Sequence, residues 1–308
     1  MNSKKVTAPL FRDPIYDGAA DPTVIWNHVE KEWWMVYMNR RATSRRMDVS
    51  WVHGTDLGIA TSKEGNQWLY CGIIEDLDIE KGRNTFWAPE IIYHEGIYHM
   101  YVSYIKGVPD SWSGHKRHIL HYTSDNLWNW IYQSTLSLSS GYVIDAAVHK
   151  LPNGKWRMWY KDEQNHSHTY AADSDDLYHW ESVGPVIIGF PHEGANVFFW
   201  QEQYWLIIDE WSGQGVYQSK DCVNWQRNSK ILDKDGIRKD DQGVGLHADV
   251  LVVNDKAYIF YFTHPDRAKG YGKDSYLSKR SSIQVAELEI ENGILTCHRD
   301  KNLILHLS

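Results

Sequence analysis

The chain repeats one arrangement of apolar and polar positions five times. Each repeat opens with a short run of β-branched and aromatic residues, and the five runs read DPTVIW, APEIIY, DAAVHK, EGANVFFW and HADVLVV. A tight polar turn follows, then a second aromatic run, a longer loop and a closing hairpin. Short apolar runs bounded by turn residues are typical of β-strands, and no long run with helical period interrupts them. Each repeat therefore predicts four short antiparallel strands.

The spacing of the repeats predicts how they are arranged. The first runs begin near residues 21, 89, 145, 193 and 247, so the repeats lie 48 to 68 residues apart. This spacing is typical of propeller blades, and a blade can bury both faces of its sheet only by packing radially against others. We predict an all-β, five-bladed β-propeller with four antiparallel strands per blade; an irregular β-sandwich is the alternative.

The predicted propeller is a single domain that spans residues 1–308. Its blades are expected near 14–75, 85–137, 142–188, 192–233 and 245–298. In four repeats the closing hairpin ends in a tryptophan, namely Trp68, Trp130, Trp180 and Trp225. The residues before Asp21 are expected to add an outer strand to the last blade and so close the ring.

Composition adds a functional hint. The chain holds 16 Trp, 19 Tyr and 7 Phe, which make up 14% of its residues. Aromatic residues are favoured in β-sheets, and their flat faces also stack on sugar rings. The composition thus favours a β-sheet core, a carbohydrate-binding surface, or both.

Charge and cysteine content exclude other classes. The net charge of −8 argues against a broad surface for nucleic acid or anionic membranes. Three cysteines without CxxC spacing suggest neither a disulfide framework nor a zinc site. The N-terminus has no apolar signal segment, and no stretch approaches 18 apolar residues, so we expect a cytoplasmic protein.

Polar side chains stand at the starts of the five first strands, where a purely structural strand would favour apolar residues. They are Asp21, Glu90, Asp145, Glu193 and His247. The first strands of a propeller line its axis and begin on one face, so these side chains are expected to surround one mouth of the central channel. One aspartate there would be a turn cap. Four carboxylates in five blades predict a ring of acids around a funnel.

The motifs ADPTVI, TFWAPEI, VIDAAV and EGANVF resemble the signatures of glycoside hydrolase family 43 and related five-bladed propeller glycosidases. The resemblance runs from about residue 14 to 290. It implies that Asp21 is the general base and Glu193 the general acid, and that Asp145 raises the pKa of the acid and orients it. Trp87 would border the sugar.

The resemblance also implies a substrate and a mechanism. The substrate would be a short oligosaccharide that loses a terminal arabinofuranosyl, xylosyl or galactosyl unit, by exo-action and with inversion. His247 would lie near the axis beside a water or a metal ion. No cofactor is required, and an axial ion would be calcium because its ligands would be mostly oxygen.

The implied chemistry has a physical need for three acids. Glycosidic cleavage requires a proton on the leaving oxygen, and an acid that works near neutral pH needs a raised pKa. A neighbouring carboxylate raises that pKa by like-charge repulsion. In an inverting enzyme the base and the acid stand roughly 6.5–9.5 Å apart, which leaves room for water.

Side chains of the surrounding loops are expected to bind the substrate. They are Arg40, Arg41, His53, Trp211 and Arg267, together with Trp87, Glu90 and His247. The loop that carries the first three is not a general feature of the resembled family. Long insertions at 40–55 and 105–117 could wall the funnel into a pocket.

Two other functions stay open. A glycoside phosphorylase would use Arg40, Arg41 and Arg267 as a phosphate pocket, although the matched base Asp21 favours attack by water. A non-catalytic carbohydrate-binding propeller would not need a carboxylate pair at the funnel. The sequence does not predict an oligomeric state.

Overall fold

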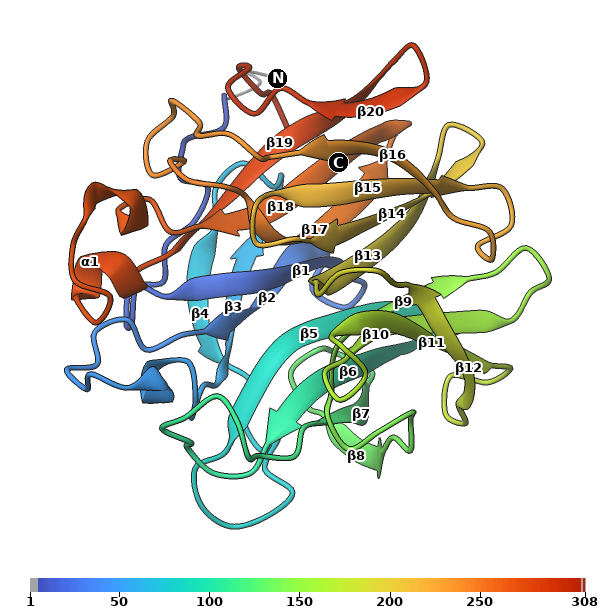
Figure 1. Cartoon of the computed structure of the whole chain (residues 1–308), viewed down its shortest axis with the longest axis horizontal. Coiled ribbons are helices and arrows are strands. Elements are labelled where there is room, and N and C mark those ends of the chain that lie inside the picture. The colour runs from blue at the N-terminus through green and yellow to red at the C-terminus, as the bar shows by residue number, and fades with distance from the viewer. Residues whose placement is uncertain (1–4, 306, 308) are drawn as a thin grey trace.

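The computed structural model describes residues 5–305 and 307, and they form five four-stranded antiparallel sheets around a central axis (Figure 1). Blade one comprises β1 (Ala19–Asn27), β2 (Glu32–Asn39), β3 (Leu57–Ser62) and β4 (Leu69–Ile73). Blade two comprises β5 (Thr85–His94), β6 (Ile97–Ile105), β7 (His118–Ser124) and β8 (Ile131–Thr135). Blade three comprises β9 (Val143–Lys150), β10 (Trp156–Asp162), β11 (His168–Ser174) and β12 (Glu181–Ile187).

The last two blades repeat this order. Blade four comprises β13 (Glu193–Trp200), β14 (Gln203–Asp209), β15 (Gln214–Ser219) and β16 (Gln226–Ile231). Blade five comprises β17 (Leu246–Val253), β18 (Lys256–Thr263), β19 (Ser282–Glu291) and β20 (Ile294–Cys297). The prediction of a five-bladed propeller is confirmed, and the sandwich alternative is wrong.

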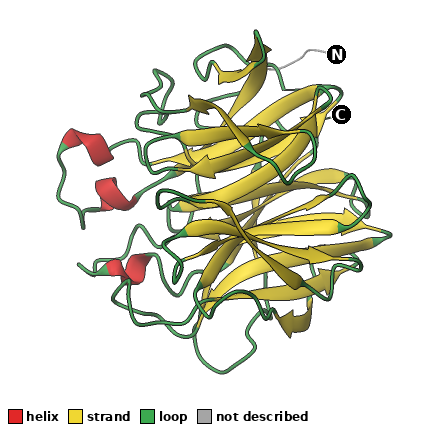
Figure 2. Cartoon of the chain, turned by 45° about the vertical axis from the view of Figure 1, so that its right-hand side comes forward, coloured by secondary structure: helices red, strands yellow, loops and turns green. Residues whose placement is uncertain are grey.

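Helix is minor in the described part of the chain. It comprises the 3₁₀ turns η1 (Val49–Trp51) and η2 (Arg267–Lys269) and the four-residue α1 (Tyr276–Lys279). All three lie on one side of the propeller, in the loops that follow β2 and β18 (Figure 2). None of these helices is long and apolar enough to cross a membrane.

The cores lie between neighbouring blades, because each sheet is apolar on both faces. Trp34, Trp159 and Trp205 come from the second strands of blades one, three and four, and all three are almost fully buried. Full burial of one large apolar side chain contributes about 1.5–3 kcal/mol. The radial packing predicted from the pattern therefore accounts for much of the aromatic content.

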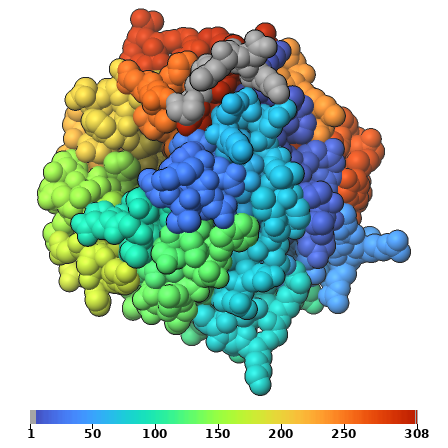
Figure 3. Space-filling view, turned by 180° about the vertical axis from the view of Figure 1, so that it is seen from behind, coloured from blue at the N-terminus to red at the C-terminus, as the bar shows by residue number. Residues whose placement is uncertain are grey.

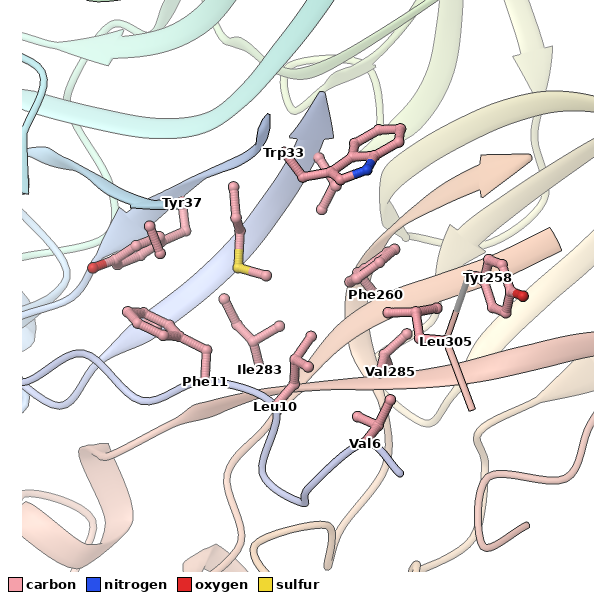
Figure 4. Packing of buried hydrophobic residues seen from close by; sticks show 14 of the residues in the cluster. Val6, Leu10, Phe11, Trp33, Tyr37, Tyr258, Phe260, Ile283, Val285 and Leu305 are labelled. Carbon is pink, nitrogen blue, oxygen red and sulfur yellow. The ribbon is translucent and has the colours of Figure 1, made fainter. Parts of the chain in front are cut away.

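The ring closes where the N-terminal segment meets blade five. Leu10 N donates to Ile283 O at 2.9 Å, and Ile283 N donates to Phe11 O at 2.9 Å. These residues pack with Tyr37 and Phe260 in the core between blades one and five (Figure 4). Seen from behind, the red C-terminal blade lies beside the blue N-terminal one (Figure 3).

The expected outer strand is only partly correct. The fourth strand of blade five is β20, from the C-terminal part of the chain, and it pairs with the distal half of β19. The N-terminal residues form only an isolated bridge at Phe11 beside the proximal half of β19. The segment thus ties the ring without forming a regular strand.

A recurrent turn precedes the tryptophans that end the hairpins, and in blades one and two the indole N–H donates to a carbonyl of this turn. In blade two, Ser124 Oγ accepts from Leu127 N at 2.9 Å, and Trp130 Nε1 donates to Leu127 O at 2.8 Å. Leu127 has a φ of 68°, and its counterpart Leu177 in blade three also has a φ of 68°. In blade two the tryptophan thus binds the carbonyl of a residue in the left-handed region.

Candidate active site

A cavity of about 680 Å³ opens where the first strands begin. Ligand sites of small molecules commonly have volumes of about 300–1,000 Å³. Four of the five predicted ring residues line this cavity, namely Asp21, Asp145, Glu193 and His247. Asp21 and Glu193 therefore lie at the same end of the propeller, as the proposed chemistry requires.

Glu90 does not line the cavity, and the strand register gives the reason. Ala20 pairs with Met38 and Thr23 with Val36, so Asp21 lies in a bulge of β1. In β5 the corresponding bulge holds Ala88, because Glu90 pairs with Tyr101 two residues further on. The expectation that Glu90 occupies the same position as Asp21 is wrong.

Glu90 belongs to a deeper layer that joins the blades. Glu90 Oε1 accepts from Val148 N of blade three at 2.8 Å. Asp249 Oδ2 accepts in the same way from Val24 N of blade one at 2.8 Å. Burial raises the pKa of Glu90 well above its usual value and that of Asp249 to about 6. Glu90 is therefore a structural brace between blades.

The bulges place the catalytic candidates in an unusual backbone conformation. Asp21 has a φ of 47° and Asp145 a φ of 59°, both in the left-handed region that non-glycine residues rarely adopt. Such strain is concentrated at functional sites. In blade four the left-handed residue is Gly194, and a Cβ there would lie 2.8 Å from the ring of His247. Glu193 consequently stands one position earlier than the aspartates of blades one and three.

Two ion pairs hold the predicted base and the predicted acid. Arg40 Nη2 lies 3.2 Å from Asp21 Oδ1, and its guanidinium lies 4.6 Å from the ring centre of Phe262. Lys161 Nζ donates to Glu193 Oε2 at 2.9 Å. Both cations come from the second strands or the loops directly after them, so they reach the cavity from the next layer of the blades.

Lys161 also belongs to a longer chain of charges along the cavity wall. Its Nζ lies 3.3 Å from Glu163 Oε1, and Glu163 is in turn bonded to Arg117. The guanidinium of Arg117 lies 5.4 Å from the ring centre of Trp87. The chain thus runs from Glu193 to the aromatic wall of blade two.

The protonation of the acids differs from the expectation. Burial raises the pKa of Asp145 to about 6, and repulsion by Glu193 adds to the rise although the nearby His247 opposes it. Burial also raises the pKa of Asp209, to about 7. Burial acts on Glu193 in the same sense, but attraction to Lys161 outweighs it and leaves the pKa of Glu193 below its usual value. The pKa values of Asp145 and Asp209 are therefore raised, whereas that of Glu193, the expected acid, is lowered.

His247 lies among these acids. Its Nδ1 is 3.8 Å from Asp21 Oδ1, and its backbone N donates to Asp209 Oδ2 at 2.7 Å. Burial disfavours the imidazolium, yet attraction to Asp21, Asp145, Glu193 and Asp209 outweighs burial and raises its pKa. A protonated His247 would partly neutralise the ring.

Four tryptophans line the cavity. They are Trp51, Trp87, Trp112 and Trp211. Trp112 and Trp211 are 56% and 47% exposed, so their faces are open to a ligand. Trp51 comes from the insertion at 40–55 and Trp112 from the one at 105–117, so both insertions contribute to the cavity.

Arg41 and His53 lie behind this wall. Arg41 Nε donates to His53 O at 3.0 Å, and the ring of His53 packs on Trp87 with centres 5.0 Å apart. His53 is fully buried, and burial lowers its pKa to about 4. Neither residue lines the cavity, so the structure does not place them where we expected them to contact a substrate; they lie against Trp51 and Trp87 instead. Arg40, Arg267, Trp87 and Trp211 do line it.

Sequence reasoning missed Lys161 and Arg117. Lys161 pairs with Ile144 at the end of the second strand of blade three, and Asp209 pairs with Glu193 at the same place in blade four. A charged residue at the end of the second apolar run, as in MWYK and LIID, is the signal that identifies Lys161 and Asp209. Arg117 has no comparable signal, because it lies in an irregular loop.

Comparison with known proteins supports the fold. No family model and no curated protein matches the chain. A thermostable family-43 glycoside hydrolase has 18% identity and a TM-score of 0.69, with 98% of this chain and 100% of that chain covered. The family 43 β-xylosidase/α-arabinofuranosidase CoXyl43, from a compost microbial metagenome, has 16% identity and a TM-score of 0.68 over 94% and 97%.

A third similar structure extends the range of sugars. It is a family 43 β-1,3-galactosidase in complex with galactodeoxynojirimycin, with 12% identity and a TM-score of 0.66 over 97% and 100% of the two chains. At these identities the likeness establishes the five-bladed fold and a wide sequence divergence. The activity of this chain has to be argued from its own cavity.

Proposed function

We propose that the protein is a glycoside hydrolase that removes a terminal sugar from a short oligosaccharide with inversion. The observation that carries the proposal is that Asp21, Asp145 and Glu193 meet in one cavity walled by tryptophans. Two of the similar structures are described as a β-xylosidase/α-arabinofuranosidase and a β-1,3-galactosidase, which supports the same class of substrate here.

In this proposal Asp21 takes a proton from the attacking water. Its ion pair with Arg40, at 3.2 Å, fixes the direction of the carboxylate. Glu193 gives a proton to the leaving oxygen from the other side of the bond. The two carboxyl groups would then flank the sugar at the separation typical of inverting enzymes, roughly 6.5–9.5 Å.

Glu193 must gain a proton before it can act as the acid. The hydrogen bond from Lys161 to Glu193 has to break first. Glu163 lies 3.3 Å from Lys161 Nζ and offers the ammonium another partner. When a sugar occupies the cavity, Lys161 would turn to Glu163 and to the sugar hydroxyls. Glu193 would then be left beside the buried Asp145, and repulsion between the two carboxylates would favour its protonated form.

The walls of the cavity favour exo-action. The loops that carry Trp51, Trp112 and Arg267 rise around the mouth, so a terminal unit would be enclosed while the leaving part points to solvent. Sugar faces would stack on the exposed rings of Trp112 and Trp211.

No metal ion is needed in this proposal. Calcium takes six to eight oxygen ligands. Among the described residues, His247 belongs to no set of three ligand atoms that lie close to one another. Asp21 is bonded to Arg40, and Asp209 accepts from two backbone N–H groups. The donor set therefore fits a calcium ion poorly, and His247, whose pKa is raised by the surrounding carboxylates, would supply positive charge in its place when protonated.

A panel of aryl glycosides and oligosaccharides, with and without phosphate, tests the proposal. We expect turnover without phosphate and an inverted anomer in the first spectra after mixing. Asp21→Asn should lose about 10²–10⁴ in kcat/KM, as is typical of lost acid–base catalysis. Asp110→Asn, at an exposed carboxylate outside the cavity, is the matched control and should keep full activity. Turnover only with phosphate would establish a phosphorylase, and sugar binding without turnover a binding protein.

A further inference from the structure

The charged groups of the cavity are largely paired. Arg40 bonds to Asp21, Lys161 to Glu193, and Arg117 to Glu163. Each of these cations therefore has a carboxylate at hydrogen-bonding distance. Arg267 also lines the cavity, and in the part of the chain that the structure describes no carboxylate is ion-paired with it.

The residues next to Arg267 do not supply the missing charge. Its Nε lies 3.4 Å from the carbonyl oxygen of Ser278. The adjacent Asp266 turns away, because one carboxylate oxygen bonds Lys269 and the other bonds Arg280. The guanidinium is accessible from the cavity, so its free N–H groups can meet a ligand.

The charge that acts on Arg267 is that of another cation, Arg40. Burial lowers the pKa of Arg267 to about 10, and repulsion by Arg40 adds to the fall. His264 also contacts Arg40: its Nδ1 donates to Arg280 O at 2.8 Å, and its Nε2 faces Arg40 Nη1 at 3.4 Å. Burial lowers the pKa of His264 well below its usual value, which favours the neutral ring. Arg40 and Arg267 thus both line the cavity and repel one another, and among the described residues Arg267 has no carboxylate ion-paired with it.

We propose that Arg267, beside Arg40, forms a subsite for an oxyanion of the substrate. Arg40 is already bonded to Asp21 and His264, so it contributes its charge, whereas Arg267 contributes free N–H donors. A guanidinium binds carboxylate, sulfate or phosphate oxygens through two parallel hydrogen bonds. This inference deepens the proposed function and rests on it for the placement of a sugar in the cavity.

The oxyanion can come from two sources. It can be a substituent of the sugar, such as the carboxylate of a uronic acid, or it can be free phosphate bound beside the sugar. Because Asp21 lies next to Arg40, an anion in this corner would be close to the position of the attacking nucleophile. The two sources therefore have different consequences for the reaction, and binding experiments separate them.

The experiment compares D-glucuronate with D-xylose, which differ only in the carboxylate at C5. Binding is measured by calorimetric or NMR titration at fixed low ionic strength, and inorganic phosphate is titrated separately. We expect glucuronate to bind the wild type at least tenfold more tightly than xylose. Arg267→Met should abolish that preference and leave xylose binding unchanged, while Arg267→Lys should keep part of it.

Lys269→Met is the matched control, because Lys269 is an exposed cation on the same short helix and does not line the cavity. It should bind both sugars as the wild type does. Phosphate binding that depends on Arg267, without a preference for glucuronate, would support the subsite and identify free phosphate as its ligand. If Arg267→Met changes the binding of neither glucuronate nor phosphate, the proposal is overturned. These readouts need no turnover, so a failure of the proposed hydrolase activity would not be mistaken for a failure of the subsite.

Discussion

At the scale of single residues, the contact between Lys161 and Glu193 has the largest consequence for the proposed reaction. Attraction to the ammonium, 2.9 Å from Oε2, lowers the pKa of Glu193. Lys161→Met should therefore raise that pKa, so that the carboxyl stays protonated to higher pH. We expect the basic limb of the kcat/KM profile to move to higher pH, as measured on an aryl glycoside.

The converse substitution provides the control for this prediction. Asp145 repels Glu193, and Asp145→Asn removes the repulsion without removing Lys161. The basic limb should then move to lower pH. If Lys161→Met and Asp145→Asn both moved the basic limb in the same direction, the assignment of Glu193 as the acid would be contradicted.

The leaving group tests Glu193 independently of pH. A nitrophenol leaves with little protonation, whereas a sugar alcohol needs a proton from the acid. Glu193→Gln should therefore lose about 10²–10⁴ on a natural oligosaccharide and retain measurable cleavage of an activated aryl glycoside. Equal losses on both substrates would exclude Glu193 as proton donor.

Sequence alone could place some of these residues and not others. Asp21, Asp145 and Glu193 lie in repeated motifs at strand starts, and the position of a strand start follows from the pattern. Glu90 was misplaced because a shift of two residues in register moves a side chain to a deeper layer. Arg41 and His53 lie in an irregular loop whose path depends on tertiary contacts, so their burial behind Trp87 could not be read from the pattern.

At the scale of elements, the serine turns fix the closing hairpins. Ser174 is buried, and its Oγ accepts from Leu177 N at 2.9 Å. Ser174→Ala would leave that N–H without a partner and should cost about 1–3 kcal/mol in the free energy of unfolding. Asp175→Ala, at the adjacent exposed residue, should change it by about 0.5 kcal/mol or less. Denaturant titration of both variants measures the difference, and equal costs would contradict the role of the hydroxyl.

The elements themselves were predictable because short apolar runs alternate with turns that carry polar residues and glycine. The ring closure was harder to predict. Whether β20 or the N-terminal segment becomes the fourth strand depends on the whole length of β19, which has room for both partners. The sequence around Phe11 shows no alternation that would distinguish a bridge from a strand.

At the scale of the whole molecule, the contact between the first and last blades holds the ring together. Phe11 is buried against Tyr37, with ring centres 5.2 Å apart, and bonds to Ile283 through its backbone. Phe11→Ala should cost about 3–5 kcal/mol, because a large buried side chain is lost from the core between the two blades. Ile15→Ala, at an exposed residue of the same segment, is the control. If Ile15→Ala lowered the free energy of unfolding and Phe11→Ala did not, the role of Phe11 in closing the ring would be contradicted.

Acidic pH should lower the free energy of unfolding of the whole molecule, because buried histidines take up protons on unfolding. His99 and His121 lie 3.0 Å apart between Nδ1 and Nε2, and burial lowers their pKa values to about 4 and about 3. In the unfolded chain a histidine has a pKa of about 6.5, so below that pH the unfolded state binds more protons and stability falls. His121→Phe keeps an aromatic ring against Tyr101 and removes one of these groups. The loss of unfolding free energy between pH 7.5 and 5 should then shrink by about 2 kcal/mol.

The control for this prediction is Tyr101→Phe. Its hydroxyl donates to Leu177 O, and burial raises its pKa well above the usual value, so no proton is exchanged between pH 5 and 7.5. The variant should lose the same free energy at both pH values, whereas His121→Phe should change the slope. Because His121 also packs on Tyr178 of blade three, a changed slope would mean that protonation acts on the contact between two blades. An unchanged slope in His121→Phe would show that this histidine pair does not limit stability in acid.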